Sequence, residues 1–199
     1  MTQESQRVLE TKERIRDAFF ELYGMKKIER ISIKEITDKA QLNRGTFYVY
    51  YKDIYDLLEK TEDELIEELM DKIKDIMIMI LRDQNLSPFL PPLEFYQRYS
   101  KFLRVLFGTN GDPNFVYKIK TIIKKTLKEI FEKENIPKVE NMEYVMEYIS
   151  SAQIGIISYW LVENNMDLPI SELGNMIKQI TLHGPVGYLK LQLENAEGK

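Results

Sequence analysis

Apolar residues recur at helical spacing along most of this chain, while strand-like alternation is absent. The first such face, between residues 7 and 24, includes Val8, Ile15, Phe19 and Leu22. Comparable apolar stripes run along residues 54–82, 115–133, 143–164 and 170–182. No internal repeat or low-complexity tract interrupts them. The pattern predicts an all-α fold.

Two shorter helices are predicted between residues 32 and 51. Ser32 is a good N-cap for the first helix, and Glu35 completes a capping box three residues later. A tight turn follows at residues 41–43, and Asn43 is a good N-cap for a second helix that begins at Arg44. The stretch therefore reads as a helix-turn-helix.

The second of these helices divides into an apolar face and a polar face. Phe47 and Tyr51 are four residues apart, so they can pack together inward. Arg44, Thr46 and Tyr48 then point away beside the small Gly45. Arg can bond guanine edges, Thr can meet a thymine methyl group or a phosphate, and Tyr can donate to phosphate. We therefore predict that this helix enters the major groove of DNA.

The stretch resembles the helix-turn-helix of the TetR family of bacterial transcriptional regulators. The resemblance covers about residues 8–68. It rests on the following residues: Ile36, Leu42-Asn43-Arg44-Gly45-Thr46-Phe47-Tyr48, Tyr50-Tyr51-Lys52-Asp53 and Leu57-Leu58. One departure concerns Ile54, because many family members carry a basic residue there that supports phosphate binding. The resemblance implies a three-helix DNA-binding domain followed by a helical C-terminal domain.

Together the polar face and the resemblance give a set of expected DNA contacts. They are Ser32, Lys34, Asn43, Arg44, Gly45, Thr46, Tyr48, Tyr50 and Lys52. The connector at residues 25–30 adds three basic residues, which either face DNA beside Lys34 or form a solvated loop.

The charge distribution agrees with DNA contact at one end of the chain only. Net charge is −4 overall. Residues 1–52 contain 11 Lys/Arg and 8 Asp/Glu, a balance of +3, which leaves 17 and 24 in residues 53–199, a balance of −7. The basic share lies with the helix-turn-helix, as an electrostatic footprint for DNA requires.

Composition argues against several other classes of protein. The chain has no Cys and a single histidine, His183, which argues against thiolate or histidine-cluster metal sites and against His-based catalysis. We expect no metal, no cofactor and no enzymatic activity. Residues 1–13 are polar and charged, so no signal peptide is expected and a cytoplasmic location is favoured.

The long apolar stripe at residues 54–82 sets the expected domain organisation. A helix of that length spans roughly 45 Å at 1.5 Å per residue, more than a three-helix bundle can cover. We predict a DNA-binding domain at residues 8–68 and a ligand-binding and dimerisation domain at residues 69–193. Three prolines between Asn85 and Pro92 should interrupt the helices after it.

Aromatic and Met-rich helices in the C-terminal part could enclose an apolar ligand pocket. The candidate pocket residues are Tyr99, Phe102, Tyr117, Tyr148, Gln153 and Trp160. The alternative for each is ordinary core packing. A basic face at residues 118–128 is either solvated or available to DNA.

A small-residue patch on the helix at residues 143–164 suggests close approach of a second copy. The expected homodimer contacts are Ser151, Ala152, Gly155 and Tyr159, with Leu173 and Ile177 from the last helix. The resemblance implies a homodimeric repressor that a small apolar or aromatic effector releases from its operator, although some relatives activate. The alternative is a helical protein-interaction module, or a coactivator with no effector of its own.

Overall fold

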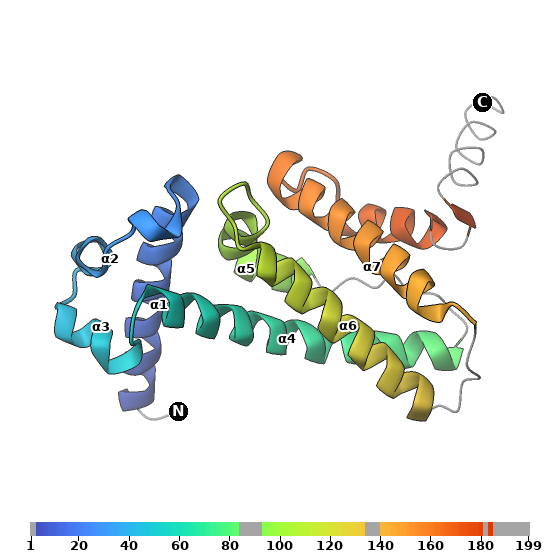
Figure 1. Cartoon of the computed structure of the whole chain (residues 1–199), viewed down its shortest axis with the longest axis horizontal. Coiled ribbons are helices and arrows are strands. Elements are labelled where there is room, and N and C mark those ends of the chain that lie inside the picture. The colour runs from blue at the N-terminus through green and yellow to red at the C-terminus, as the bar shows by residue number, and fades with distance from the viewer. Residues whose placement is uncertain (1–2, 84–92, 134–139, 181–182, 185–199) are drawn as a thin grey trace. The chain divides into compact units, whose positions relative to one another are not determined.

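The structure, a computed structural model, describes residues 3–83, 93–133, 140–180 and 183–184 (Figure 1). Every regular element in these ranges is helical, so the predicted all-α class is confirmed. The predicted break at Asn85–Pro92 lies outside the described residues, as does the C-terminal end of the predicted second domain. None of the helices described is both long enough and apolar enough to cross a membrane.

Seven α-helices and two short helical segments carry labels in chain order. They are α1 (Gln3–Met25), η1 (Ile28–Arg30), α2 (Ile33–Ala40), α3 (Arg44–Tyr50), α4 (Ile54–Asp83), α5 (Leu93–Leu106), α6 (Pro113–Lys133), α7 (Met142–Ser158) and η2 (Tyr159–Glu163). A further helix occupies residues 170–180. The helix predicted at 143–164 is thus α-helical only to Ser158 and continues as a π-helical turn.

The chain divides into two compact units. One comprises Met1–Glu68 and Arg98–Phe115, and the other comprises Leu69–Gln97 and Val116–Lys199. Helix α4 contributes to the first unit up to Glu68 and to the second unit from Leu69. Residues 98–115 also belong to the first unit, so neither unit is one contiguous stretch of the chain.

Long-range packing explains why the second half of α5 belongs to the first unit. The ring of Phe102 lies 4.6 Å from that of Phe20 on α1, centroid to centroid. Lys101 pairs with Glu21 on α1 at 3.0 Å. Tyr99 donates a hydrogen bond to Glu68 on α4. Residues of α5 therefore complete the hydrophobic core under α1.

The core of the first unit is built around aromatic residues of α1 and α3. Phe19, Phe20, Ile36, Phe47 and Leu57 are fully buried. Helix α2 packs on α1, and α3 contacts α2. The apolar spacing that predicts these helices thus also predicts their buried faces.

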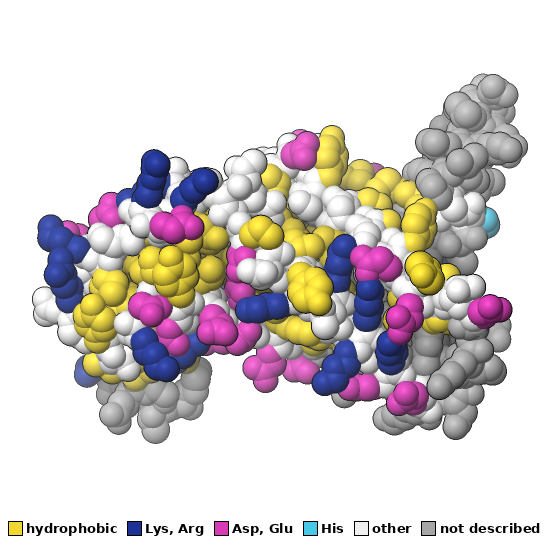
Figure 2. Space-filling view, in the orientation of Figure 1, with side chains coloured by type: hydrophobic (Ala, Val, Ile, Leu, Met, Phe, Trp, Pro, Cys, Tyr) yellow, Lys and Arg dark blue, Asp and Glu magenta, His cyan; other side chains and the backbone are white. Residues whose placement is uncertain are grey.

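In the second unit, α6 and α7 are joined by ion pairs. Lys120 bonds Glu147 at 3.2 Å, Lys124 also pairs with Glu147, and Lys128 pairs with Glu143 at 2.7 Å. Figure 2 shows basic and acidic side chains intermingled over these helices. Hydrogen bonds from Lys124, Lys120 and Ser151 lower the pKa of Glu147 to about 2. The basic face of α6 is therefore matched by carboxylates of the same chain.

Candidate DNA-binding surface

The N-terminus of α2 carries the predicted capping box. Ser32 Oγ accepts from the Glu35 backbone N–H at 3.2 Å, and Glu35 accepts from the Ser32 backbone N–H at 2.9 Å. Lys26 adds a bond to Glu35 at 2.6 Å. These bonds, from Lys26 first, lower the pKa of Glu35 to about 2. The network fixes where α2 begins.

The turn after α2 is held by backbone bonds and by a side chain of α1. Gln41 has a φ of 54°, and the Leu42 N–H bonds Thr37 O at 2.9 Å, as in a Schellman motif. Arg14 donates to Ala40 O at 2.5 Å and to Gln41 O at 3.1 Å. Carbonyl groups that the end of a helix leaves unpaired thus receive a charged donor.

Helix α3 begins after Asn43, as predicted, but without a side-chain cap. Asn43 has an extended backbone, and its side chain makes no capping hydrogen bond. The backbone carbonyl of Asn43 accepts from the Thr46 N–H at 3.0 Å instead. The Asn43 amide is therefore not used to cap the helix.

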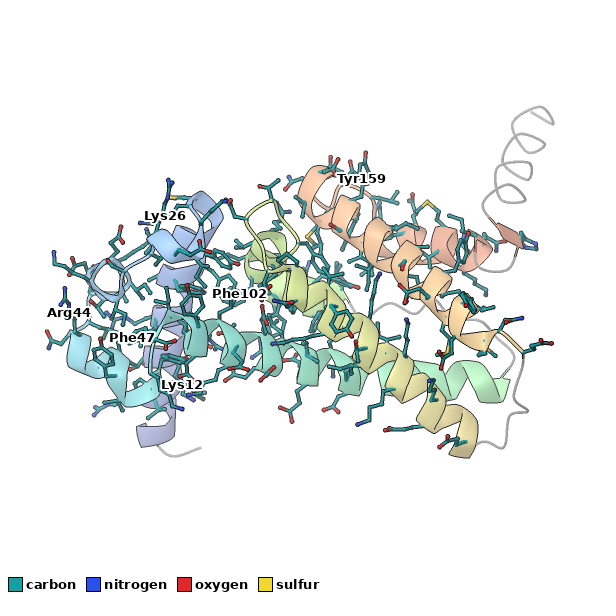
Figure 3. The ribbon with its side chains drawn as sticks, viewed as in Figure 1. Lys12, Lys26, Arg44, Phe47, Phe102 and Tyr159 are labelled. Carbon is teal, nitrogen blue, oxygen red and sulfur yellow. The ribbon has the colours of Figure 1, made fainter. Side chains whose placement is uncertain are left out.

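Phe47 anchors the inner face of α3. Its ring lies 5.6 Å from that of Tyr51, which agrees with the predicted pairing. Burial raises the pKa of Tyr51 to about 12, so its hydroxyl stays neutral. Figure 3 shows Phe47 on the side of α3 toward α1, and Arg44 at the outer edge of the unit. The packing of Phe47 thus sets which face of α3 is exposed.

The exposed face of α3 differs from the prediction at two positions. Arg44, Gly45 and Tyr48 are exposed as expected, with Tyr48 at 57%. Thr46 is half-buried, because it lies on the flank of the helix rather than on its outer face. Val49 is 73% exposed and was not among the predicted contacts. The signal for Val49 was its spacing, since it lies four residues after Gly45 on the same face.

The packing of the chain does not require a glycine at position 45. A Cβ added there would meet no atom within 4 Å. Gly in a helix is less favourable than Ala by roughly 1 kcal/mol, so its presence on this face is unexplained by folding. A bare backbone on an exposed helix face permits close approach of another molecule.

The junction between α3 and α4 is a second capping network. Asp53 accepts from the backbone N–H groups of Tyr55 and Asp56, each at 2.9 Å. Asp56 accepts from the Lys52 N–H at 2.9 Å and from Lys60 Nζ at 2.9 Å. These two bonds, from Lys52 first, lower the pKa of Asp56. Lys52 itself has an exposed side chain, and Tyr50 is half-buried.

The basic residues near the helix-turn-helix fall into two groups. Lys26 is paired with Glu35, and Lys34 lies 3.4 Å from Asp38 while remaining largely exposed. Lys27 and Arg30 are exposed without an ion pair inside the described ranges. Figure 2 shows Lys and Arg side chains at the surface over α2 and the start of α3. A positive surface therefore borders the exposed face of α3.

The six predicted pocket residues lie in different surroundings. Tyr99 and Phe102 belong to the first unit, where they contact Glu68 and Phe20. Tyr117 and Tyr148, in the second unit, are 71% and 60% exposed. The Gln153 side-chain nitrogen is buried and has no hydrogen-bond partner within the described residues.

Trp160 is a core residue of the second unit. Its indole N–H donates to Leu168 O at 2.8 Å, and its ring meets Tyr96 edge to face at 5.2 Å. Both its polar group and its ring are thus occupied by the chain itself. Ordinary core packing, the alternative to a ligand pocket, accounts for the burial of Trp160.

The predicted dimer residues also separate into two groups. Gly155 and Tyr159 are exposed, and Ala152 is half-buried. Ser151 bonds Lys120 and Glu147 within the chain. Leu173 and Ile177 are each 2% exposed, so they pack inside their own unit and offer almost no area to a second copy. The apolar spacing of residues 170–180 reflects core packing.

A search of the described residues for three or more His, Cys, Asp or Glu side chains able to hold a metal ion finds no such group. Two of the acidic residues of α4 form ion pairs instead, Asp56 with Lys60 and Glu64 with Arg16.

Comparisons with known proteins identify the family of this chain. A TetR-series family model described as "Transcriptional regulator C-terminal region" matches residues 84–183, half of the chain. The chain is 24% identical over 161 residues to the "Uncharacterized HTH-type transcriptional regulator YxbF" of Bacillus subtilis (strain 168). That match covers 75% of this chain and 39% of the relative, so the matched part of the chain spans well under half of the length of that protein.

A solved structure has the same fold. The "Dihydroxyacetone kinase operon activator DhaS" aligns with a TM-score of 0.55 at 20% identity, covering 86% of this chain and 94% of that chain. The family match extends over the C-terminal half, and the helix-turn-helix, with its capping box at Ser32 and Glu35, precedes it. The chain belongs to the TetR family of transcriptional regulators.

Proposed function

We propose that this regulator binds a specific operator in double-stranded DNA through the exposed face of α3. The observation that carries the proposal is the combination on that face of Arg44, Gly45, Tyr48 and Val49. The Arg44 guanidinium suits the edges of bases, and the bare backbone of Gly45 allows close approach. The Tyr48 phenol suits phosphate, and the two methyl groups of Val49 suit thymine methyl groups. The other proposed DNA contacts lie on α2, on α3 or close to their ends: Ser32, Lys34, Asn43, Thr46, Tyr50 and Lys52.

Selection of DNA from a random pool by the purified protein tests this function. The proposal predicts enrichment of one sequence, arranged as two related half-sites about one helical turn apart. Enrichment of no sequence would contradict it. The rival function is that of a helical protein-interaction module. It predicts that no DNA sequence is enriched and that α3 binds a protein partner.

We infer that the functional form is a homodimer built on α7. Three- and four-residue steps link Val145, Tyr148, Ala152 and Gly155 on α7, and Tyr159 and Val162 follow on the π-helical turn η2. All are exposed except Ala152, which is half-buried. Such a stripe is the pattern of a helix-helix seam. A Cβ added to Gly155 would meet nothing within 4 Å, so its lack of a side chain serves no contact inside the chain.

The seam supports a dimer of helices that approach closely at Ala152 and Gly155, with tyrosines supplying apolar area on either side. An isologous interface of this kind presents two copies of α3, which matches an operator with two half-sites. The interface excludes Leu173 and Ile177 because they are buried in their own chain.

We propose further that a small apolar or aromatic effector releases the protein from its operator, so that it represses. The buried amide nitrogen of Gln153 is the anchor that best fits this idea, since a ligand carbonyl could accept its hydrogen bond. The DhaS protein is described as an activator, so repression by this chain needs its own test. A reporter gene placed behind the selected operator shows directly whether the regulator represses or activates transcription. Repression predicts that deletion of the regulator raises expression, and lower expression would indicate an activator.

A further inference from the structure

The C-terminal end of α3 is held by a lysine that belongs to the next helix. Lys60 lies on α4, ten residues after Tyr50, and its Nζ donates to Tyr50 O at 3.1 Å. The last carbonyls of a helix have no partner within the helix, and cations interact favourably with that end of its dipole. Lys60 therefore supplies to α3 a charged C-terminal partner that the sequence of α3 itself lacks.

Lys60 has further contacts that fix where its ammonium lies. Its Nζ bonds Asp56 Oδ2 at 2.9 Å and lies 5.6 Å from the centre of the Tyr51 ring, within cation–π range. Asp56 Oδ2 in turn accepts from the Lys52 backbone N–H at 2.9 Å. The chain from Tyr50 to Lys52 is thus bonded at both ends to one ion pair of α4.

These contacts lie at the C-terminal end of α3, the helix that carries the proposed DNA-binding face. The Tyr50 carbonyl and the Lys52 N–H bracket the point where α3 ends, and Tyr50 and Lys52 are both proposed DNA contacts. We propose that Lys60 is a positioning residue for operator recognition, which acts through Tyr50 O and Asp56 to fix the orientation of α3 rather than by touching DNA. This inference rests on the proposed DNA-binding function.

The test uses the full-length protein with Lys60→Met, which keeps the side chain long and removes the ammonium. Lys72→Met is the matched control, because Lys72 is exposed on the same helix twelve residues later, roughly 18 Å away at 1.5 Å per residue. Affinities for the selected operator and for random-sequence DNA are measured across a range of salt concentrations.

A positioning role predicts that Lys60→Met weakens operator binding about three- to tenfold, the effect of one partly exposed charge-assisted hydrogen bond. Binding to random-sequence DNA should weaken less than binding to the operator. The slope of affinity against salt concentration should equal that of Lys72→Met. Lys60→Arg should recover most of the operator affinity, since it keeps a charged donor.

Two DNA-binding outcomes would overturn the inference. A parallel loss on both DNAs, with a salt slope reduced by about one unit, would mean that Lys60 contacts phosphate directly. Operator affinity equal to that of Lys72→Met would mean that operator binding by α3 does not depend on the contacts of Lys60 with Tyr50 O and Asp56. If the wild-type protein selects no DNA at all, the proposed function fails first and separately.

Amide hydrogen exchange keeps the inference testable without any DNA. Lys60→Met should speed exchange of the Tyr51 N–H, which bonds Phe47 O at 3.0 Å at the end of α3. The buried amides of α1 around Phe19 should keep their protection. Uniform loss of protection across the first unit would show a general stability role instead, and would overturn the positioning role.

Discussion

Glu35 accepts a 2.6 Å hydrogen bond from Lys26 while it closes the capping box with Ser32 at the start of α2. One carboxylate therefore fixes the connector after α1 and the first turn of the helix-turn-helix. Lys26, counted by sequence among the basic residues available to DNA, is engaged within the protein.

This arrangement predicts a pH-dependent contribution of Glu35 to stability. The pKa of Glu35 in the folded protein is about 2, below the ordinary value for a glutamate, so ionised Glu35 favours the folded state. The contribution is complete above about pH 5 and is lost as pH falls toward 2. Glu35→Gln should be less stable than wild type at pH 7, with the difference shrinking below pH 5. A difference in urea midpoint that stays constant from pH 7 to pH 2 would contradict this.

The local parts of the fold are the ones that sequence predicts well. The Ser32–Glu35 box and the Phe47–Tyr51 pair each join residues within four positions, so spacing alone specifies them. They also fix the boundaries of α2 and α3 to within a residue or two.

Contacts between distant residues are not specified by spacing. Leu173 and Ile177 have the same periodicity whether they face a second copy or their own core, and the structure places them in the core. Phe102 reads as a pocket residue but packs on Phe20. The lysines of α6 read as a solvated face, yet Lys120 and Lys124 pair with Glu147. Which helices become neighbours decides each case.

Val49 offers a test of base readout by an exposed apolar residue. Val49→Ala removes methyl groups from a side chain that is largely exposed, and Ala has the higher helix propensity. Thermal stability should therefore stay the same or rise slightly. We expect a weaker preference for thymine at one base pair in a repeated DNA selection. An unchanged selected sequence would remove Val49 from the reading face.

Lys52 and Tyr48 should act on the DNA backbone. Lys52→Ala should weaken binding to the operator and binding to random-sequence DNA alike. It should also flatten the salt dependence of binding by about one unit of slope. Tyr48→Phe should also weaken both DNAs in parallel, without a change in slope. Lys72→Ala serves as the control for loss of a positive charge. A salt slope equal to wild type in Lys52→Ala would count against Lys52 as a phosphate contact.

Gly155→Arg tests the proposed dimer seam on α7. The surrounding space is open in the single chain, so the variant should fold with near-native helix content. It should be monomeric by light scattering, and operator affinity should collapse although residues 1–68 are unchanged. Gly155→Ala, which adds one methyl group, is the matched control and should remain dimeric. A dimeric Gly155→Arg protein that binds operator would move the interface away from α7.

The most direct test of the account is a titration of wild-type protein and Arg44→Ala on the DNA that the wild type selects. We predict that the wild type binds its selected site at least about a thousandfold more tightly than random DNA. Arg44→Ala should lose ~1–3 kcal/mol on that site and accept other bases at one position, as removal of a bidentate guanine contact requires. Equal affinity and equal base preference in the two proteins would contradict readout of the operator by α3.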